Sequence, residues 1–380
     1  MIKVLITGGA GFIGSHLSKL LIVENIPIRI VDSLSPQIHG ALPEGLDWLA
    51  DERVEFIRGS ITDRQTLEAA LSGITHVIHL AAETGTGQSM YEMARYNEIN
   101  SQGTALLLDI LANRRDHGVQ RLILSSSRSV YGEGAYVCQA CGDSSRRIFP
   151  GARSAVQLAA HQWNPQCPHC EASLVAVPTR ENDPVRPASI YAATKYAQED
   201  LVRVACDALG IGYAILRLQN VYGEGQSLKN PYTGILSIFS TRIRRGLELP
   251  IFEDGLETRD FVHVEDVARA MCACITSPEP VNKVINVGSG IGTSVTDVAR
   301  LLAISLQRDV PIRVTSQFRL GDIRHNVADI TLLRELVQGG PQVALADGLD
   351  RFTAWVLTQP LPEDGLERAN AELRARKLMA

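Results

Sequence analysis

Three side chains in this sequence are of the types needed to move a proton and a hydride together. The segment SIYAATKYAQEDL carries Tyr191 and Lys195 four residues apart, and therefore on one face of a predicted helix. Ser127 stands at the end of the strand-like run RLILSSS. A tyrosine hydroxyl ordinarily titrates near about pH 10, but a nearby lysine ammonium would favour its ionised form. The tyrosine could then take a proton from a substrate hydroxyl while hydride leaves, with the serine orienting the same oxygen.

A Tyr-x3-Lys pair alone is more often a surface pair on a helix, so the assignment depends on a cofactor site in the same chain. TGGAGFIGSHL follows the first predicted strand and opens a helix, with glycines at Gly8, Gly11 and Gly14. This spacing suits a tight turn, close approach of backbone N–H groups to a pyrophosphate, and close packing of helix on strand. Asp32 ends the second strand, in IRIVDSL, where an acid binds a ribose diol and repels a 2′-phosphate. The pattern therefore predicts NAD rather than NADP.

Four cysteines form two C-x2-C pairs, Cys138 with Cys141 and Cys167 with Cys170, with 25 residues between the pairs. The spacing resembles that of zinc ribbons and knuckles, in which two tight turns present four thiolates to one ion. Since four thiolates leave no open position, zinc there would be structural and would order a segment with little apolar surface of its own. The alternatives are reduced vicinal thiols without metal and a redox dithiol. His161 and His169 are interpreted as bystanders.

The elements that must position these groups follow a βαβ rhythm. Apolar runs KVLIT, IRIVD, VEFIRG, HVIHLAA and RLILSS predict buried parallel strands, and residues 12–24, 64–72 and 92–114 predict the helices between them. We expect a Rossmann-type doubly wound parallel sheet with a smaller C-terminal substrate-binding domain and a zinc-ribbon-like insertion. The expected boundaries are 1–132 and 181–223 for the NAD-binding part, 133–180 for the insertion, 224–360 for the second domain, and 361–380 for a solvated helix or frayed tail to which no function is assigned.

Composition narrows the function classes. The chain has 380 residues and a net charge of −5 with no long basic run, which disfavours a nucleic-acid surface and a charge-driven membrane surface. No apolar run reaches the roughly 18 residues of a membrane helix, and MIKVLITGGAGFIG indicates a strand and turn rather than a signal peptide. Seven cysteines, an odd number, favour reduced thiols and a cytoplasmic location.

The motifs TGGAGFIG, HLAA, SSSRSVYG, YAATK, RLQNVYG and TRDFVHVEDVARA stand in an order that resembles the extended short-chain dehydrogenase/reductase family, in particular its nucleotide-sugar epimerases and dehydratases. The resemblance covers residues 1 to about 357 apart from the insertion. It implies that Ser127, Tyr191 and Lys195 are catalytic. It also implies that Asn220, Arg259 and Arg319 bind the diphosphate of a sugar nucleotide, with Asp322 on its ribose. Further implied contacts are Phe12, Ile13, Ile61, Ala81 and Ala82 for NAD and Thr84 for the substrate. Ser60 stands where the family usually has an acid for the adenine.

The resemblance also suggests the reaction. Dehydratases of the family carry an Asp-Glu pair just after the catalytic serine or threonine, and this chain has Arg128 and Ser129 there. Asp32 disfavours an NADPH-dependent 4-ketoreductase. The intact triad favours 4-epimerisation, with decarboxylation as a minor alternative. Asn326, where strict UDP-glucose 4-epimerases often have tyrosine, implies a wider sugar pocket. The segments SSSRSVYGEG and TGTGQSMYE and the cysteine insertion are similar to bacterial dTDP-L-rhamnose 4-epimerases, which interconvert that sugar nucleotide with dTDP-6-deoxy-L-talose.

Two further alternatives stay open at this point. The substrate could be a UDP-hexose, either glucose or N-acetylglucosamine, in place of a dTDP-6-deoxy sugar. A cofactor-sensing regulator without catalysis is disfavoured because such proteins commonly lose the tyrosine or lysine. The family further implies a homodimer joined through the long helices near 92–114 and 189–209.

Overall fold

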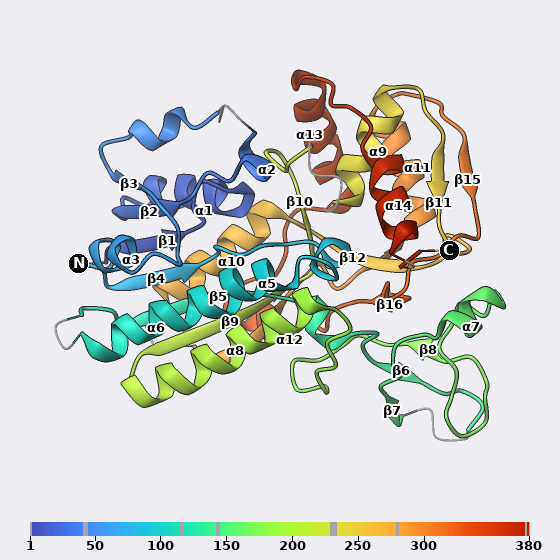
Figure 1. Cartoon of the computed structure of the whole chain (residues 1–380), viewed down its shortest axis with the longest axis horizontal. Coiled ribbons are helices and arrows are strands. Elements are labelled where there is room, and N and C mark those ends of the chain that lie inside the picture. The colour runs from blue at the N-terminus through green and yellow to red at the C-terminus, as the bar shows by residue number, and fades with distance from the viewer. Residues whose placement is uncertain are drawn as a thin grey trace.

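The computed structural model describes residues 2–40, 45–114, 117–141, 145–228, 234–278, 281–376 and 378–379. A large lobe built on a parallel sheet lies beside a smaller mixed lobe. The three-stranded sheet of the segment between residues 133 and 180 projects away from both lobes (Figure 1). No helix within the described ranges combines the length and apolar character needed to cross a membrane.

The large lobe is built on seven parallel strands in the order β3-β2-β1-β4-β5-β9-β13. Each strand coincides with a β-branched, apolar run, as expected for strands covered on both faces. The predicted doubly wound parallel sheet is therefore confirmed. The strands are β1 (Val4–Thr7), β2 (Ile28–Asp32), β3 (Val54–Arg58), β4 (His76–His79), β5 (Arg121–Ser127), β9 (Gly212–Leu218) and β13 (Lys283–Val287).

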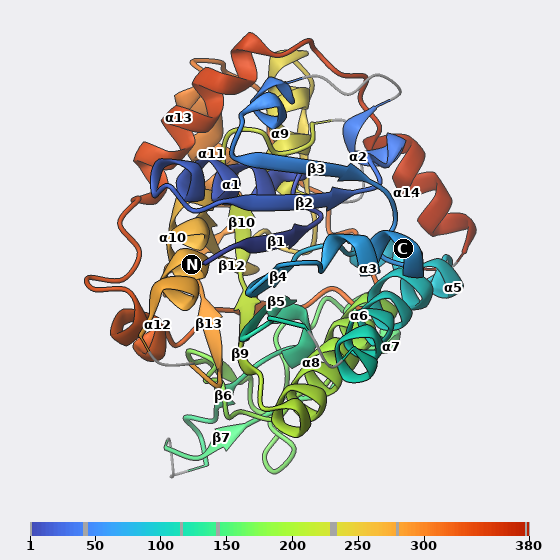
Figure 2. The same ribbon diagram turned by 90° about the vertical axis from the view of Figure 1, so that its left-hand side faces the viewer.

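Helices cover both faces of this sheet (Figure 2). On one face, Ile6, Ile30 and Leu216 pack against helices that include Leu17 and Met271. On the other face, the buried side chains of the sheet pack against helices that contribute Leu67, Leu107 and Val202. The first layer comprises α1 (Phe12–Val23), α10 (Val264–Thr276) and α12 (Thr331–Leu336), and the second α3 (Arg64–Ala70), α6 (Gly103–Asn113) and α8 (Ile190–Leu209).

The expected single helix over 92–114 is wrong in detail. The segment is divided into α5 (Met93–Tyr96), a π-helical stretch η2 (Asn97–Gln102) and α6. The side chain of Asn100, within the π-helical stretch, accepts from the amide of Glu83 at 2.8 Å and donates to the Thr194 hydroxyl at 3.0 Å. The wider turn therefore carries a buried amide that joins the loop after β4 to helix α8, and such turns often occur near functional sites.

The smaller lobe has its own core, centred on Phe239, Leu302 and Phe352. Strand β12 (Thr258–His263) pairs with three others, and a separate two-stranded sheet lies at the outer side. The remaining elements of this lobe are β10 (Asn220–Tyr222), α9 (Ile235–Arg244), β11 (Leu249–Ile251), β14 (Gly292–Ser294), α11 (Val295–Ser305), β15 (Ile312–Val314), β16 (His325–Asn326) and α13 (Leu345–Thr358).

The segment between β5 and α8 departs from the βαβ rhythm. It forms a three-stranded antiparallel sheet of β7 (Arg147–Ile148), β6 (Tyr136–Val137) and β8 (Val175–Ala176). It also contains the short helix α7 (Ala155–Ala159). Its apolar core is only Tyr136, Cys138, Cys167 and Leu174 with a few half-buried neighbours. Short elements elsewhere are α2 (Pro36–His39), η1 (Asp47–Ala50), α4 (Thr86–Ser89) and η3 (Arg128–Tyr131).

Buried ion pairs attach this insertion to the smaller lobe. Arg153 donates to Glu133 at 3.0 Å and to Glu253 at 2.8 Å, and the side chains of all three are less than 5% exposed. Arg324 extends the network by pairing with Glu253 and with Asp254. The insertion therefore shares a buried polar interface with the loops before β12 and β16.

The C-terminal segment, expected to be a solvated helix or a frayed tail, forms a helix, but this helix is partly buried rather than solvated. Helix α14 (Leu366–Ala375) buries Leu366, Ala369, Asn370 and Leu373. It contacts the large lobe, where the Tyr91 hydroxyl donates to Glu372 at 3.2 Å. It also contacts the smaller lobe, where Arg319 donates to the Asn370 side chain at 2.8 Å. The helix therefore bridges the two lobes.

Candidate active site

A cavity of about 550 Å³ opens where the central strands end, between the large lobe and the smaller one. Its walls come from the loops after β1, β2, β3, β4, β5 and β9, the edge at which doubly wound sheets bind ligands. The cavity brings together most of the residues predicted from the sequence: Gly8, Gly11, Phe12, Ile13, Gly14, Asp32, Ser60, Ile61, Ala81, Ala82, Thr84, Ser127, Tyr191, Lys195 and Asn220.

The glycine turn after β1 forms one end of the cavity. Gly8 has φ +69°, and a Cβ there would lie 2.8 Å from the amide nitrogen of Ala81. The turn thus needs glycine both for its backbone conformation and for close approach of the neighbouring strand end. Beside it, the Asp32 carboxylate accepts from the amides of Ala10 at 3.1 Å and Leu34 at 2.9 Å. The acid is held at the cavity wall, in the place where it can meet a ribose diol.

The close packing of Gly14 against the turn leads to a testable prediction about the stability of the protein. A Cβ at this position would lie 2.6 Å from the Cα of Gly9, within the turn itself. We expect Gly14→Ala to lower the free energy of unfolding by about 1–3 kcal/mol and to reduce bound NAD, because the helix must move away from the turn. Melting temperature and NAD released on denaturation are the measurements. Gly151→Ala, where a Cβ meets nothing within 4 Å, is the control; equal melting temperatures for both variants would contradict the packing argument.

The three residues of the predicted triad lie together on the side of the cavity opposite the glycine turn. Ser127 ends β5, and Tyr191 and Lys195 lie one turn apart on α8. The Ser189 side chain caps α8 by accepting from the amide of Ala192 at 3.1 Å, which fixes the start of the helix just before the tyrosine. Burial raises the pKa of Tyr191, whereas hydrogen bonding with Ser127 and the charge of Arg128 act in the opposite direction.

Hydrogen bonds hold the Lys195 side chain in place at the cavity wall. Its Nζ donates to the carbonyl of Ser125 at 2.6 Å and to the Gln198 side chain at 2.9 Å, and burial lowers its pKa to about 7. Gln198 in turn donates to Thr104 at 2.7 Å, and Thr104 meets His79 at 2.9 Å. A continuous chain of buried polar groups therefore fixes the lysine in position.

Comparisons with known proteins show the family of this chain. A family model described as the NAD dependent epimerase/dehydratase family matches residues 4–288, which is 285 of the 380 residues. The chain is also 39% identical to dTDP-L-rhamnose 4-epimerase of Burkholderia thailandensis over 93% of this chain and 94% of that protein.

The chain belongs to the NAD-dependent epimerase/dehydratase family. Solved structures of family members share its fold: UDP-glucose 4-epimerase of Thermotoga maritima with UDP-glucose has a TM-score of 0.72 at 30% identity, covering 94% of this chain and 99% of that one. UDP-glucuronic acid 4-epimerase of Bacillus cereus with UDP-glucuronic acid and NAD has a TM-score of 0.74 at 26% identity over the same shares. The resemblance inferred from the motifs is confirmed, and the chain is an enzyme of the epimerase type.

Three of the residues that the family resemblance assigned to the substrate do not line the cavity. Arg259 donates to the backbone carbonyls of Thr258, Ile323 and Arg324. Arg319 stacks on the ring of Phe252 and donates to Asn370, and its buried Nε has no hydrogen-bond partner within the described ranges. Asp322 lines a separate small cavity at the root of the insertion. Asn326, expected at the sugar pocket, is buried on β16 and is likewise outside the cavity wall.

Arg128 lines the cavity but had no role assigned from the sequence. Arg128 follows Ser127 in η3, and its Nε donates to the Asn220 side chain at 2.8 Å. In the sequence, this position indicated only that the acid found in the dehydratases is missing. The available signal was the residue type itself, a cation directly after the catalytic serine.

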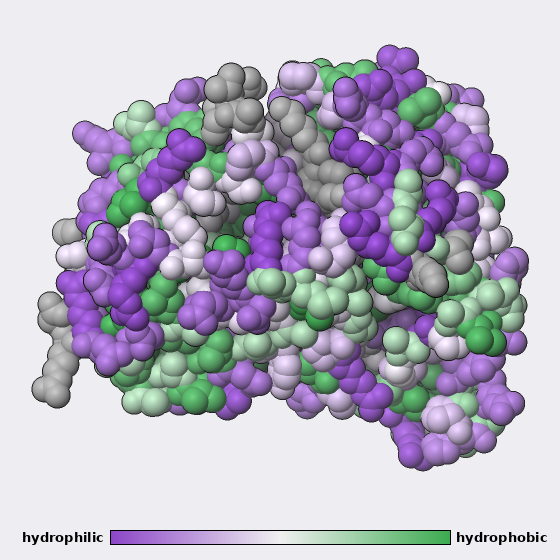
Figure 3. All heavy atoms as spheres, in the orientation of Figure 1, coloured by the Kyte–Doolittle hydropathy of each residue, from purple (hydrophilic) through white to green (hydrophobic). Residues whose placement is uncertain are grey.

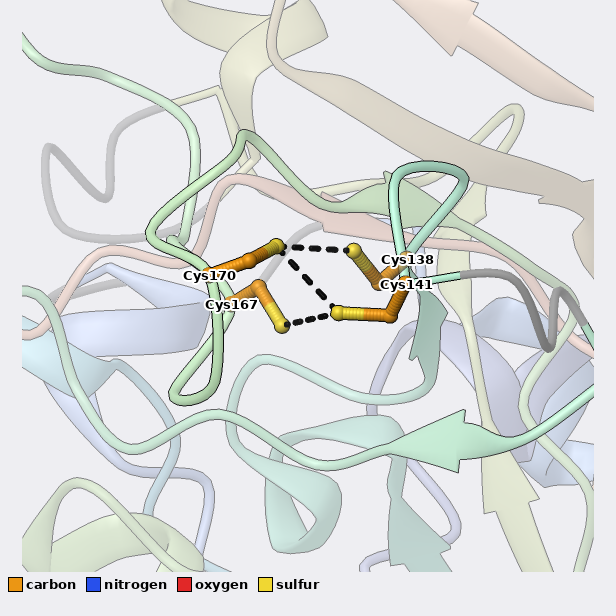
Figure 4. Close-up of side chains that lie close together, drawn as sticks. All are labelled: Cys138, Cys141, Cys167 and Cys170. Atoms are coloured by element: carbon orange, nitrogen blue, oxygen red, sulfur yellow. Dashed lines mark hydrogen bonds between the residues drawn. The ribbon is translucent and has the colours of Figure 1, made fainter.

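The four cysteines of the insertion converge on one point (Figure 4). Their sulfurs all lie within 4.8 Å of one another, and the nearest separations are 3.5 Å for Cys138–Cys170, 3.6 Å for Cys141–Cys167 and 3.2 Å for Cys141–Cys170. Disulfide sulfurs would be about 2.05 Å apart, whereas four thiolates at about 2.3 Å from one zinc ion lie about 3.8 Å apart. Hydrogen bonds from the amides of His169 and Cys170 lower the pKa of Cys167 to about 6. The donor set fits a closed tetrahedral zinc site.

Proposed function

We propose that this chain is a nucleotide-sugar 4-epimerase that acts through a transient 4-keto sugar, with dTDP-L-rhamnose and dTDP-6-deoxy-L-talose as its substrate pair. The observation that carries the proposal is the shared cavity in which Ser127, Tyr191 and Lys195 meet the glycine turn and Asp32. The 39% identity to a dTDP-L-rhamnose 4-epimerase supports the choice of sugar.

The residues have distinct tasks in this reaction. NAD, held by the glycine turn and Asp32, would supply the hydride acceptor and donor that a 4-keto intermediate requires. Tyr191 removes the proton from the C4 hydroxyl and later gives it back. Ser127 holds the same oxygen by a hydrogen bond, and Lys195 adds positive charge that favours the phenolate.

The cavity wall argues against dehydration. Its only carboxylates among the described residues are Asp32 and Glu83. Asp32 is held by the amides of Ala10 and Leu34, and Glu83 is paired with Arg95 at 2.9 Å. Elimination of water needs an acid and a base beside the sugar, and the positions after Ser127 hold Arg128 and Ser129. Epimerisation needs neither carboxylate.

Proton NMR of the purified protein tests the proposal. Without added cofactor, the protein is incubated separately with dTDP-L-rhamnose, UDP-glucose, UDP-N-acetylglucosamine and UDP-glucuronate. We expect a new anomeric signal with the couplings of the C4 epimer in the dTDP-L-rhamnose sample. Conversion of a UDP-hexose alone would replace the proposed sugar, following the similarity to the UDP-glucose 4-epimerase structure. No conversion in any sample, even after NAD is added, would favour a reductase or a cofactor-sensing regulator.

We further propose that Cys138, Cys141, Cys167 and Cys170 hold one structural zinc ion. The support is the convergence of four sulfurs around a point in a segment with a very small apolar core. Elemental analysis of protein purified without chelator should give about one zinc per chain, and a metal-free wild type would contradict the proposal. Four reduced thiolates also support a cytoplasmic location, since all seven cysteines are free.

The proposed assembly is a homodimer joined through α6 and α8. These helices pack side by side on the same face of the sheet, and Figure 3 shows apolar side chains along the edge that they form. Val204 on α8 is 58% exposed, which supports a covered surface there. Light scattering after size-exclusion chromatography should give twice the chain mass, and Val204→Glu should shift it toward the monomer.

A further inference from the structure

Arg128 is the charged side chain of the cavity whose role the proposed reaction leaves open. It lines the same wall as Ser127, Tyr191 and Asn220. Only its Nε is engaged, with the Asn220 side chain at 2.8 Å. Within the described part of the chain, neither terminal nitrogen of its guanidinium has a hydrogen-bond or ion-pair partner. Two N–H groups on each of these nitrogens are therefore free to bind a ligand.

Arg128 also has no ion-pair partner among the described residues. The charged groups that face it are Arg259, Asp322, Asp260 and the hydroxyl of Tyr191. Asp260 is occupied by the Ser289 hydroxyl and by the amides of Ser289, Gly290 and Ala328. Asp322 makes no ion pair with Arg128, and Arg259 adds a like charge. Burial and Arg259 together lower the pKa of Arg128, as expected for a cation that lacks a partner.

We propose that Arg128 is a further catalytic residue, whose free guanidinium nitrogens bind oxygen atoms of the nucleotide sugar next to its reacting carbon. The inference rests on the proposed epimerase function. Its ligand chemistry is that of oxygen acceptors, from a sugar hydroxyl or from the sugar-linked phosphate. A fork of two N–H groups suits both, and charged hydrogen bonds of this kind are stronger than neutral ones.

The same guanidinium assists the chemical step. When the C4 hydroxyl loses its proton to Tyr191, the C4–H bond breaks, its electron pair leaves as hydride to NAD⁺, and C4 becomes a carbonyl. The step requires Tyr191 to begin as phenolate inside a buried site. The other groups facing Tyr191 are Ser127 and Tyr96, which are neutral, and Lys195, which is engaged with Ser125 and Gln198. Besides Lys195, Arg128 is thus a cation whose charge supports the phenolate before NAD binds.

Three substitutions separate charge from geometry. Arg128→Lys keeps the charge without the fork, Arg128→Gln keeps a donor for Asn220 without the charge, and Arg128→Met removes both. We expect kcat/KM to fall about 10- to 100-fold in the Gln and Met variants, with a smaller loss in the Lys variant. The acid limb of the kcat profile should move up by about one pH unit in the two neutral variants and stay in place in the Lys variant. Arg313→Met, at an exposed arginine on β15 paired with Glu248, is the matched control.

A second measurement tests the inference independently of enzyme activity. Ultraviolet difference titration of each variant against the same variant with Tyr191→Phe reports the ionisation of Tyr191 alone. The phenolate should form at higher pH in Arg128→Met than in wild type. An unchanged titration together with unchanged kcat/KM would overturn the role of Arg128. A wild type that converts no sugar would instead overturn the proposed function, while the titration would still decide whether Arg128 acts on Tyr191.

A loss confined to KM would identify Arg128 as a substrate-binding group only, and would refute its part in the chemical step. The source of the bound oxygen follows from binding of dTDP alone compared with dTDP-L-rhamnose by calorimetry. Weaker binding of both in Arg128→Met points to the phosphate, and weaker binding of the sugar nucleotide alone points to the sugar. Equal binding of both ligands by wild type and variant would refute direct contact.

Discussion

Tyr191→Phe is expected to reduce turnover by about 10²- to 10⁴-fold while NAD stays bound, because the variant loses the group that carries the C4 proton. Phenylalanine keeps the ring that packs edge-on against Tyr96, 6.5 Å between centroids, so helix α8 should remain in place. The glycine turn and Asp32 are unchanged, and they hold the cofactor from the other side of the cavity. Steady-state rates by NMR and NAD content after denaturation are the two measurements.

Tyr196→Phe provides the matched control. Tyr196 is on the same helix but is outside the cavity wall, so its loss should leave the rate close to that of wild type. If Tyr191→Phe also turned over at near wild-type rates, the phenol could not be the proton carrier, and the mechanism would be wrong. If NAD were lost from Tyr191→Phe, the rate could not be interpreted without added cofactor, and saturation with NAD would then separate binding from chemistry.

Replacing Cys138 and Cys141 by serine should remove the metal and unfold the insertion. The core of this segment is Tyr136, Cys138, Cys167 and Leu174, too small to offset the chain entropy of the segment. Structural zinc binding contributes about 10–16 kcal/mol in small zinc-dependent units, so its loss should be decisive here. Limited proteolysis should then cleave within 133–180, and elemental analysis should find no zinc.

Cys272→Ser, a half-buried thiol on α10, is the control for general effects of cysteine substitution. It should keep its zinc and its protease resistance. Resistance to proteolysis in the Cys138/Cys141 double variant would show that the insertion folds without metal, even if wild-type protein contains zinc. The two readouts therefore separate metal binding from a structural role of the metal.

The residues whose positions follow from local sequence lie together in the cavity. The turn at Gly8 and the position of Asp32 depend on a strand, a turn and a helix that are adjacent in the chain, and periodicity alone locates them. The lysine and tyrosine were found because one helical turn separates them. The NAD end and the proton-transfer end therefore came from short-range pattern, supported by the family resemblance.

The parts that depend on tertiary contacts were not predicted. The π-helical stretch around Asn100 exists where that side chain bonds to Glu83 and Thr194, and no local signal marks it. Helix α14 is highly charged, and its few apolar residues gave no indication that both lobes would cover them. Arg128 became a candidate only when the structure showed that two of its nitrogens have no partner among the described residues.

The ion pairs at the root of the insertion have a consequence for behaviour in salt. Arg153 of the insertion and Glu253 of the smaller lobe are 1% and 4% exposed, whereas surface pairs such as Arg300 with Asp297 are more than half exposed. Mobile ions at about 0.1 M screen exposed charges beyond about 10 Å, but they screen a buried pair much less. Raising the ionic strength should therefore weaken the outer pairs and leave the insertion fastened to the smaller lobe. The ion pairs that hold the insertion should therefore depend little on the salt concentration.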